Sequence, residues 1–273
     1  MPNLRIRNQT KDTTEIYLYD SIGGDGFFTT GIEAKDFVPN LNAIKTNRIN
    51  LRINSDGGDV FEGLTIYNAL LRHPAEVHSY VDGLAASIAS VIALAGKTVS
   101  MAPNAFYMIH NPWMVAAGDA ALFRDLAERM DKVAGNMAAI YQAKTKASND
   151  QVTQWMNAET WFTAEEATTA GFADAIDAEA LPIAACLRHP EAFKHLPKQF
   201  RASSDAKPKY NQRLAAMLRQ ASAAQNHFPG GLHATQPRRD SLRNGRDHRT
   251  ESGHHGAGRN PKPGPQPRRN AGV

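Results

Sequence analysis

Cysteine and long hydrophobic runs are what this 273-residue sequence has least of. Cys186 is the only cysteine, so an intrachain disulfide is excluded and we expect a reducing compartment. No stretch reaches the roughly 18 apolar residues that span a bilayer, and the N-terminal sequence has no apolar signal segment. The sequence therefore predicts a cytoplasmic protein that does not enter a membrane.

Motifs for nucleotides and metals are also missing from the sequence. There is no Gly-x-x-x-x-Gly-Lys-Ser/Thr loop, so we expect this chain to have no ATPase activity of its own. No cluster of cysteine and histidine has the spacing of metal ligands, and the neighbouring His254 and His255 do not supply one. We therefore expect no metal and no organic cofactor.

Charge is distributed unevenly along the chain, although its net charge is only +4. Residues 203–273 contain 13 lysine and arginine residues and only 4 aspartate and glutamate residues, whereas residues 1–202 are net acidic. The same C-terminal stretch holds 7 of the 15 prolines and 8 of the 20 glycines, so it cannot bury enough apolar surface to offset its chain entropy. We predict a folded domain over residues 1–202 and a disordered basic tail over residues 203–273.

Two interpretations of this tail stay open. Its basic side chains could contact nucleic acid or a scaffold protein through electrostatic attraction. Its composition after about Asn226 is rich in arginine, glycine, proline and histidine, which is equally what a shifted reading frame produces.

Strand-like and helix-like segments alternate within residues 1–202. Five segments have the short apolar or alternating pattern of strands: 15–19, 49–53, 77–81, 98–101 and 106–109. Helical spacing follows at 34–41 and 60–71, and a further helix is expected to begin at Ser87. This order predicts an α/β layered domain with a largely parallel sheet, whose functional loops gather where strands end and helices begin.

Three motifs fall at such strand ends. Asn54–Gly58 (Asn-Ser-Asp-Gly-Gly) forms a glycine-rich turn, Ser87 follows the small residues Gly83, Ala85 and Ala86, and His110 precedes an Asn-Pro pair. A hydroxyl nucleophile, an imidazole base and free backbone N–H groups are the components of serine acyl transfer. The sequence therefore indicates that Ser87 is a nucleophile and His110 its base.

Each motif alone also has an ordinary structural interpretation. A serine before a helix is most often an N-cap, a diglycine is most often a turn, and a single histidine at a strand end is usually structural. The combination favours catalysis. The small residues before Ser87 allow a sharp turn that exposes the hydroxyl, and the glycines let the backbone approach a substrate.

Together these motifs resemble the proteolytic subunit of the Clp protease, a family of serine peptidases with a crotonase-like fold. The resemblance covers about Glu15 to Asp177 and includes a fourth motif, Trp161–Ala167 followed by Ala170–Asp174. The segments 6–10, 15–20, 82–84 and 159–161 are most similar to the phage and prophage branch, the Clp-related head maturation proteases. The resemblance implies a homo-oligomeric ring that cleaves peptides or proteins, with an AAA+ unfoldase or capsid proteins as partners.

The same resemblance implies roles for individual residues. Ser87 matches the nucleophile, His110 matches the base, and the backbone N–H groups of Gly58 and Ile88 match the oxyanion hole. The family's catalytic aspartate corresponds to Glu159, whose carboxylate is one methylene farther from the backbone and can still orient an imidazole.

Two alternatives to an active peptidase stay open. Glu159 replaces the family's aspartate and Asp56 replaces its usual proline before the glycines, so the chain could be an inactive structural paralogue. Intact Ser87 and His110 argue against this, although Asp56 is expected to loosen the loop and to place a negative charge near the substrate cleft. A crotonase-type acyl-CoA enzyme would share the fold, but it would need no nucleophilic serine.

The longest helical pattern spans Asp119 to Lys144. Its apolar residues are spaced by three or four positions: Leu122, Leu126, Met130, Val133, Met137 and Ile140. This helix could belong to the domain core. The resemblance implies instead a protruding helix through which two rings stack, and we favour this role in assembly.

Overall fold

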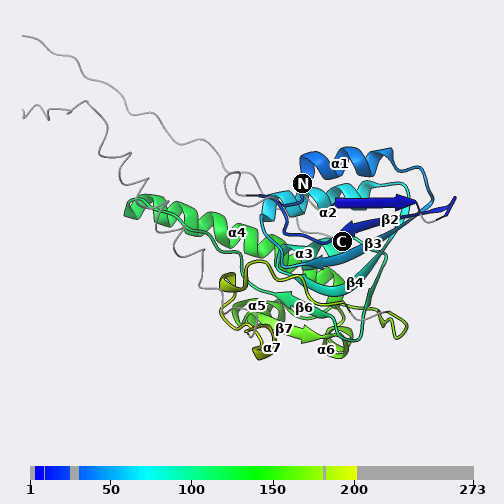
Figure 1. Ribbon diagram of the computed structural model, residues 1–273. Helices are drawn as coiled ribbons and strands as arrows, with labels where there is room; N and C mark the ends of the chain where they lie inside the picture. Colours follow the sequence, from blue (N-terminus) through cyan, green and yellow to red (C-terminus); the bar gives the residue numbers. More distant parts are fainter. Residues whose placement is uncertain (1–3, 9, 25–30, 181–182, 202–273) are drawn as a thin grey trace, which may run out of the picture. The chain divides into compact units, whose positions relative to one another are not determined.

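Residues 4–8, 10–24, 31–180 and 183–201 are described by the computed structural model in Figure 1. The strands are β1 (Leu4–Asn8), β2 (Thr13–Leu18), β3 (Arg48–Ser55), β4 (Glu76–Ala86), β5 (Thr98–Met101), β6 (Phe106–Ile109), β7 (Thr160–Thr163) and β8 (Ala175–Ile176). The helices are α1 (Ala34–Ala43), α2 (Val60–Arg72), α3 (Ile88–Ala93), α4 (Ala120–Thr145), α5 (Asn149–Asn157), α6 (Ala164–Ala170) and α7 (Lys198–Arg201), with a short 3₁₀ helix at Pro190–Ala192. The predicted tail, residues 203–273, lies outside the described residues and stays a prediction.

The described strands form one mixed sheet with the order β1–β2–β3–β4–β5–β8. Neighbours from β2 to β5 are parallel, whereas β1 runs antiparallel to β2. The long strand β4 changes partner along its length, because residues 78–81 pair with β5 and residues 84–86 pair with β6. β6 also pairs antiparallel with β7. The end of β4, from which Ser87 follows, therefore lies between β3 and β6.

The predicted α/β class with a largely parallel sheet is confirmed. All five predicted strands are present, as are the helices predicted at 34–41, at 60–71 and after Ser87. β4 is longer than predicted, and β1, β7 and β8 are additions to the predicted set. β7 (Thr-Trp-Phe-Thr) has no apolar–polar alternation, and β8 contains only 2 residues, too few for such a pattern to be recognised in the sequence.

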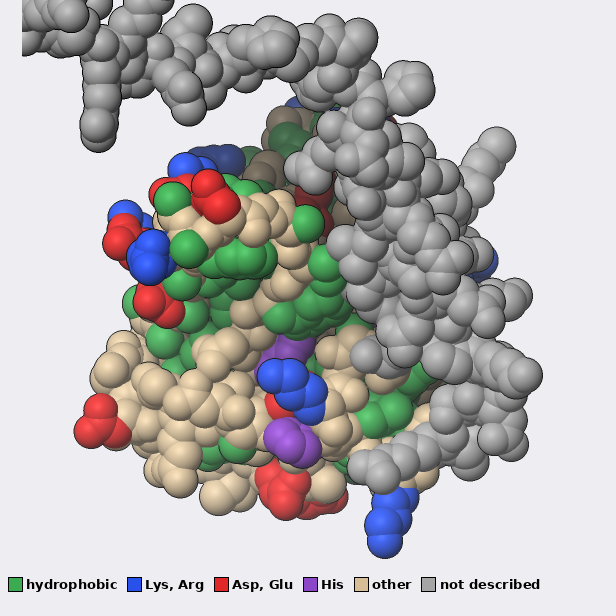
Figure 2. Space-filling view, turned by 90° about the vertical axis from the view of Figure 1, so that its left-hand side faces the viewer, with side chains coloured by type: hydrophobic (Ala, Val, Ile, Leu, Met, Phe, Trp, Pro, Cys, Tyr) green, Lys and Arg blue, Asp and Glu red, His purple; other side chains and the backbone are tan. Residues whose placement is uncertain are grey.

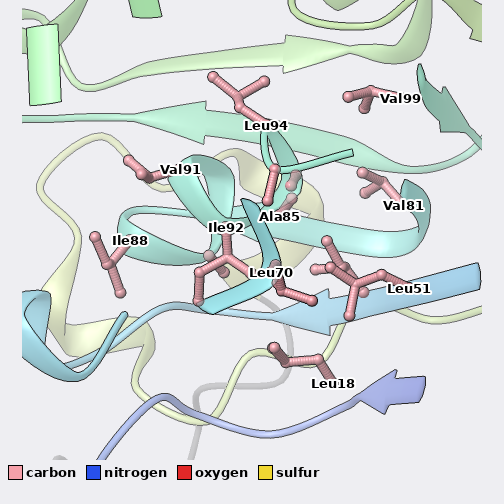
Figure 3. Packing of buried hydrophobic residues seen from close by; sticks show 14 of the residues in the cluster. Leu18, Leu51, Leu70, Val81, Ala85, Ile88, Val91, Ile92, Leu94 and Val99 are labelled. Atoms are coloured by element: carbon pink, nitrogen blue, oxygen red, sulfur yellow. The ribbon is translucent and has the colours of Figure 1, made fainter. Parts of the chain in front are cut away.

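The main core is formed by β2–β6 together with the helices that pack on them. Figure 3 shows Leu70 of α2 between Ile92 of α3 and Leu51 of β3. All six residues of α3 are buried. The element that follows Ser87 is therefore fixed inside a close-packed interior, where a displaced side chain is costly.

A smaller cluster covers the other face of the sheet around the end of β4. Successive strand residues point to opposite faces, so Ala85 belongs to the main core while Leu84 and Ala86 belong to the smaller cluster. Phe193 and Leu196, which follow β8 in the chain, are buried in the smaller cluster. Full burial of one such side chain contributes about 1.5–3 kcal/mol. Residues 193–196 are therefore an integral part of the fold.

The long helix α4 is anchored only through its C-terminal half. Met137, Ala138 and Tyr141 are buried, whereas Leu122 and Phe123 are 40% and 49% exposed. Figure 1 shows the N-terminal half of α4 extending away from the sheet. Figure 2 views the molecule from the side toward which α4 projects, and it shows hydrophobic side chains on that side. The C-terminal half is thus a core helix and the N-terminal half protrudes. No helix in the described ranges is both long and apolar enough to cross a membrane.

Candidate active site

Ser87 occupies the sharp turn between β4 and α3. Its backbone angles are φ 54° and ψ −129°, a conformation that costs a non-glycine residue about 1–3 kcal/mol. The Ser87 N–H donates a hydrogen bond to the Met108 carbonyl at 3.0 Å, which ties the turn to β6. The Ser87 hydroxyl forms no capping hydrogen bond with α3. The N-cap interpretation therefore does not apply to this side chain.

Hydrogen bonds of buried hydroxyl groups hold the Ser87 turn in place. The Ser90 hydroxyl donates to the Ser87 carbonyl at 2.5 Å and lies 2.8 Å from the Tyr141 hydroxyl. The Tyr107 hydroxyl donates to the Ser90 carbonyl at 2.5 Å. Because these groups are buried and satisfied, tyrosines from β6 and α4 fix the turn that carries Ser87.

His110 follows β6 and lies beside Ser87. The parallel pairing of Ala86 with Met108 brings the ends of β4 and β6 together, although they are far apart in the sequence. His110 Nε2 lies 2.8 Å from Ser87 Oγ, and the two residues are only 6% and 9% exposed. This distance is that of a hydrogen bond between a nucleophile and its base.

Glu159 lies in the loop between α5 and β7, on the other side of the His110 ring. Its Oε2 is 3.8 Å from His110 Nδ1, an ion-pair distance longer than a hydrogen bond. The backbone N–H groups of Lys194 and His195 donate to the Glu159 carboxylate at 2.9 and 2.6 Å. Burial acts to raise the pKa of Glu159, but His110 and these two N–H groups outweigh burial and lower the pKa to about 2. The structure thus brings Ser87, His110 and Glu159 together, with Nε2 of His110 toward the serine and Nδ1 toward the carboxylate.

The diglycine turn packs directly against Ser87. A Cβ on Gly57, whose φ is 94°, would lie 2.7 Å from the Ser87 Cβ, and a Cβ on Gly58, whose φ is 142°, would lie 2.1 Å from the Ile22 carbonyl oxygen. Both positions therefore require glycine. Within the described part of the chain, the N–H groups of Gly58 and Ile88 donate no hydrogen bond. These two groups, predicted to form the oxyanion hole, remain available next to the serine.

Asp56 is held firmly, contrary to the expected loosening of the loop. It is 4% exposed, and its Oδ2 accepts hydrogen bonds from the Arg188 and His189 N–H groups at 2.8 and 2.9 Å. Its Oδ1 accepts a hydrogen bond from the Ser21 hydroxyl at 2.8 Å. Three hydrogen bonds thus fix the position that proline usually occupies in the family, and the negative charge is buried among donors.

Residues 183–196, which we call the C-terminal strap, complete the surroundings of the site and are absent from the predicted site residues. The strap contacts Glu159 and Asp56 through the backbone N–H groups given above. It also contacts Asn54, whose Nδ2 donates to the Ala184 carbonyl at 3.0 Å and whose Oδ1 accepts from the Cys186 N–H at 2.7 Å. Because every residue except proline carries a backbone N–H, the sequence gives no signal for such contacts.

Comparison with known protein families identifies the chain. The family model described as Clp protease matches residues 33–180. The chain belongs to the Clp protease family. The matched range of this Clp protease family chain contains Ser87, His110 and Glu159, and it ends before the C-terminal strap begins.

Two relatives illustrate the extent of the similarity. The ATP-dependent Clp protease proteolytic subunit 2 of Corynebacterium efficiens is 34% identical over 132 residues, which make up 47% of this chain and 66% of that protein. The corresponding subunit 2 of Mycolicibacterium paratuberculosis is 28% identical over 195 residues, or 67% of this chain and 97% of that protein. The match to the Corynebacterium protein spans just under two thirds of its length.

A solved structure establishes the fold of this Clp protease family chain. A point mutant of ClpP1 from Listeria monocytogenes superposes with a TM-score of 0.52 at 24% identity, covering 60% of this chain and 91% of that one. The predicted ClpP-like fold is therefore confirmed. Within the described ranges, no group of three or more histidine, cysteine, aspartate and glutamate side chains is placed to hold a metal ion.

Proposed function

We propose that this chain is a serine endopeptidase in which Ser87 is the nucleophile, His110 the general base and Glu159 the orienting acid. The observation that carries the proposal is the 2.8 Å contact between His110 Nε2 and Ser87 Oγ. The Ser87 hydroxyl is free for this contact because it does not cap α3. The strained turn that carries it is fixed by the hydrogen bond from the buried Ser90 hydroxyl to the Ser87 carbonyl. Strained backbone of this kind concentrates at functional sites.

The proposed reaction passes through an acyl-enzyme. His110 Nε2 accepts the hydroxyl proton as Ser87 Oγ attacks the carbonyl carbon of the scissile peptide bond. The protonated His110 then gives this proton to the leaving amine nitrogen as the peptide bond breaks, which leaves the acyl group on Ser87. Water attacks the acyl group while His110 takes its proton, and the return of that proton to Ser87 Oγ releases the acid product.

Two further groups act on charge that develops during the reaction. The N–H groups of Gly58 and Ile88 bind the carbonyl oxygen as it becomes negative, which is the role for which free donors beside the serine are suited. The Glu159 carboxylate stabilises the imidazolium form of His110 and fixes the ring orientation. Its contact with Nδ1, 3.8 Å in the free protein, is of the kind that shortens when substrate binds.

A direct assay separates this proposal from its alternatives. Hydrolysis of a fluorogenic peptide, with no turnover of an acyl-CoA thioester, is the expected result. A crotonase-type enzyme would consume the thioester and spare the peptide. An inactive paralogue would consume neither substrate.

We also propose protein substrates and partners for this activity. The relatives above are named as ATP-dependent, which favours an AAA+ unfoldase as partner. The similarity of the N-terminal segments to phage and prophage members favours capsid proteins and head maturation instead. Cleavage of a capsid protein without ATP would support the second partner, and a requirement for ATP together with an unfoldase would support the first.

Assembly into a ring is proposed to involve the protruding half of α4. The double substitution Leu122→Asp with Phe123→Asp is expected to convert the particle into smaller species, because two exposed apolar side chains would lose a partner surface. Light scattering at micromolar concentration measures the change in mass. Val133 is left intact, because it packs against the main core and its replacement would test folding instead.

The matched control for this assembly test is Lys132→Asp, which adds negative charge at an exposed position of the same helix. This control should keep the wild-type mass, and every variant should melt cooperatively. A monomeric wild-type protein, or a double variant of unchanged mass, would contradict the proposed role of α4.

The tail is proposed to be dispensable for catalysis. Truncation after Arg201 is expected to leave peptide hydrolysis and melting temperature nearly unchanged, because residues 203–273 are too polar and too rich in proline and glycine to pack. Any binding of DNA or acidic protein by the tail should weaken steeply as salt rises. A truncated protein with a much lower melting temperature, or without peptidase activity, would place the tail within the fold.

A further inference from the structure

The C-terminal strap runs past the site through a series of hydrogen bonds to polar side chains. It begins where the Asn104 side chain donates to the Ile183 carbonyl at 3.0 Å, and it continues along Asn54 and Asp56 at the end of β3. It then reaches the loop before β7, where it meets Glu159. In Figure 1 it is the yellow-green to yellow chain between β8 and α7. The strap therefore connects the diglycine turn to the Glu159 loop.

The strap is also held by apolar contacts close to His110. Phe193 packs edge-on against Trp161 with ring centroids 5.3 Å apart, and its ring centroid lies 5.9 Å from that of His110. Leu196 is buried in the same cluster. The two N–H groups that bond to Glu159 come from residues 194 and 195, between these two buried side chains. Their position is therefore set by packing on both sides.

Each of these N–H groups bonds to a different oxygen of the Glu159 carboxylate. The Lys194 N–H donates to Oε2, the oxygen that faces His110 Nδ1, and the His195 N–H donates to Oε1. Two donors on two oxygens fix both the position of the carboxylate and the rotation of its plane. They also favour its charged form, which agrees with the lowered pKa of Glu159.

We infer that the C-terminal strap is a positioning element of the active site, which holds the Glu159 carboxylate toward His110 through the backbone N–H groups of Lys194 and His195. This inference rests on the proposed function, because it assigns the strap to the same catalytic acid. The strap lies beyond residues 33–180, the range that the family model matches. The acid thus lies within the matched range, whereas the donors that hold it lie outside that range.

The inference is tested by removing one backbone donor while leaving the rest of the strap in place. Lys194→Pro deletes the N–H that bonds to Oε2, and Lys194→Ala is the matched control that keeps it. The Lys194 side chain is exposed, and Phe193 has φ −110° and ψ 131°, angles that a residue before proline readily adopts. Both variants are therefore expected to fold, which thermal melting checks.

The expected result is a lower kcat with little change in KM for Lys194→Pro alone. Loss of one hydrogen bond to a buried carboxylate corresponds to a fall in kcat of about 10- to 100-fold, whereas Lys194→Ala should stay near the wild-type kcat. In a Glu159→Gln background the proline and alanine variants should have equal kcat, because the strap then has no charged acid to position.

Different outcomes separate failure of the inference from failure of the proposed function. An active wild-type enzyme in which Lys194→Pro matches Lys194→Ala would overturn the inference alone. A wild-type protein without peptidase activity would overturn the proposed function. If Lys194→Pro does not fold, Asp56→Asn replaces it, since Asp56 holds the strap at Arg188 and His189. Its fall in kcat must disappear in the Glu159→Gln background, and an unchanged effect there would contradict the inference.

Discussion

Ser87→Ala is expected to abolish labelling by a fluorophosphonate and to lower kcat for peptide hydrolysis by about 10⁶-fold, as loss of a catalytic serine does in other triads. The physical reason is the loss of the oxygen that lies 2.8 Å from His110 Nε2 and forms the acyl bond. Mass spectrometry of the labelled wild-type protein should place the modification on Ser87 and on no other serine. Labelling that persists in Ser87→Ala would disprove the assignment.

Two further variants show whether the label reports catalytic geometry. His110→Ala should reduce labelling strongly, because the serine then lacks the base that activates it. Ser148→Ala is the matched control: Ser148 also precedes a helix, but its hydroxyl accepts a hydrogen bond from the Gln151 N–H and so acts as an ordinary N-cap. This control should label at the wild-type rate.

The fold could be predicted where periodicity is local. Strands 49–53 and 106–109 and the helix after Ser87 were recognisable because apolar residues recur at the spacing of each element. The change of partner along β4 was not recognisable, since it depends on pairing with strands that lie far along the chain and has no local signal in the sequence. Residues 84–86 at the end of β4 pair with β6, and Ser87 follows them beside His110.

The candidate site also has residues that the sequence predicts and contacts that it does not. Ser87, His110 and the glycines belong to contiguous motifs, and the residue type at each position carries the chemistry. The fixing of Asp56 and Glu159 could not be predicted, because their partners are backbone N–H groups more than thirty residues away. Expecting Asp56 to loosen the loop was wrong for this reason: the missing proline ring is replaced by contacts that only the folded chain provides.

Glu159→Gln is expected to lower kcat by up to about 10⁴-fold while leaving the fold intact, by analogy with the loss of the triad acid in other serine peptidases. Glutamine has nearly the same size, so the loop keeps its packing, but it offers no negative charge to the imidazolium and only one acceptor oxygen to the two strap N–H groups. Glu165→Gln, on the exposed side of α6, is the matched control and should keep the wild-type kcat.

Acid unfolding gives a second, independent measurement on Glu159. The pKa of Glu159 falls from an ordinary 4.5 to about 2 in the folded protein, so its ionised form contributes stability that is fully present above about pH 4.5 and is lost as pH falls toward 2. Glu159→Gln lacks this contribution and should lose less stability than the wild type over that interval.

The length of the acidic side chain provides the final test of this assignment. Glu159→Asp keeps the charge but withdraws the carboxylate by one methylene, from a position where Oε2 is already 3.8 Å from His110 Nδ1. The strap donors must follow the carboxylate for it to remain bound, so a kcat between those of the wild type and Glu159→Gln is expected. A wild-type kcat in Glu159→Gln would make the carboxylate a bystander. Equal kcat values for the aspartate and glutamine variants would instead mean that position, and not charge alone, decides whether this acid can orient the imidazole.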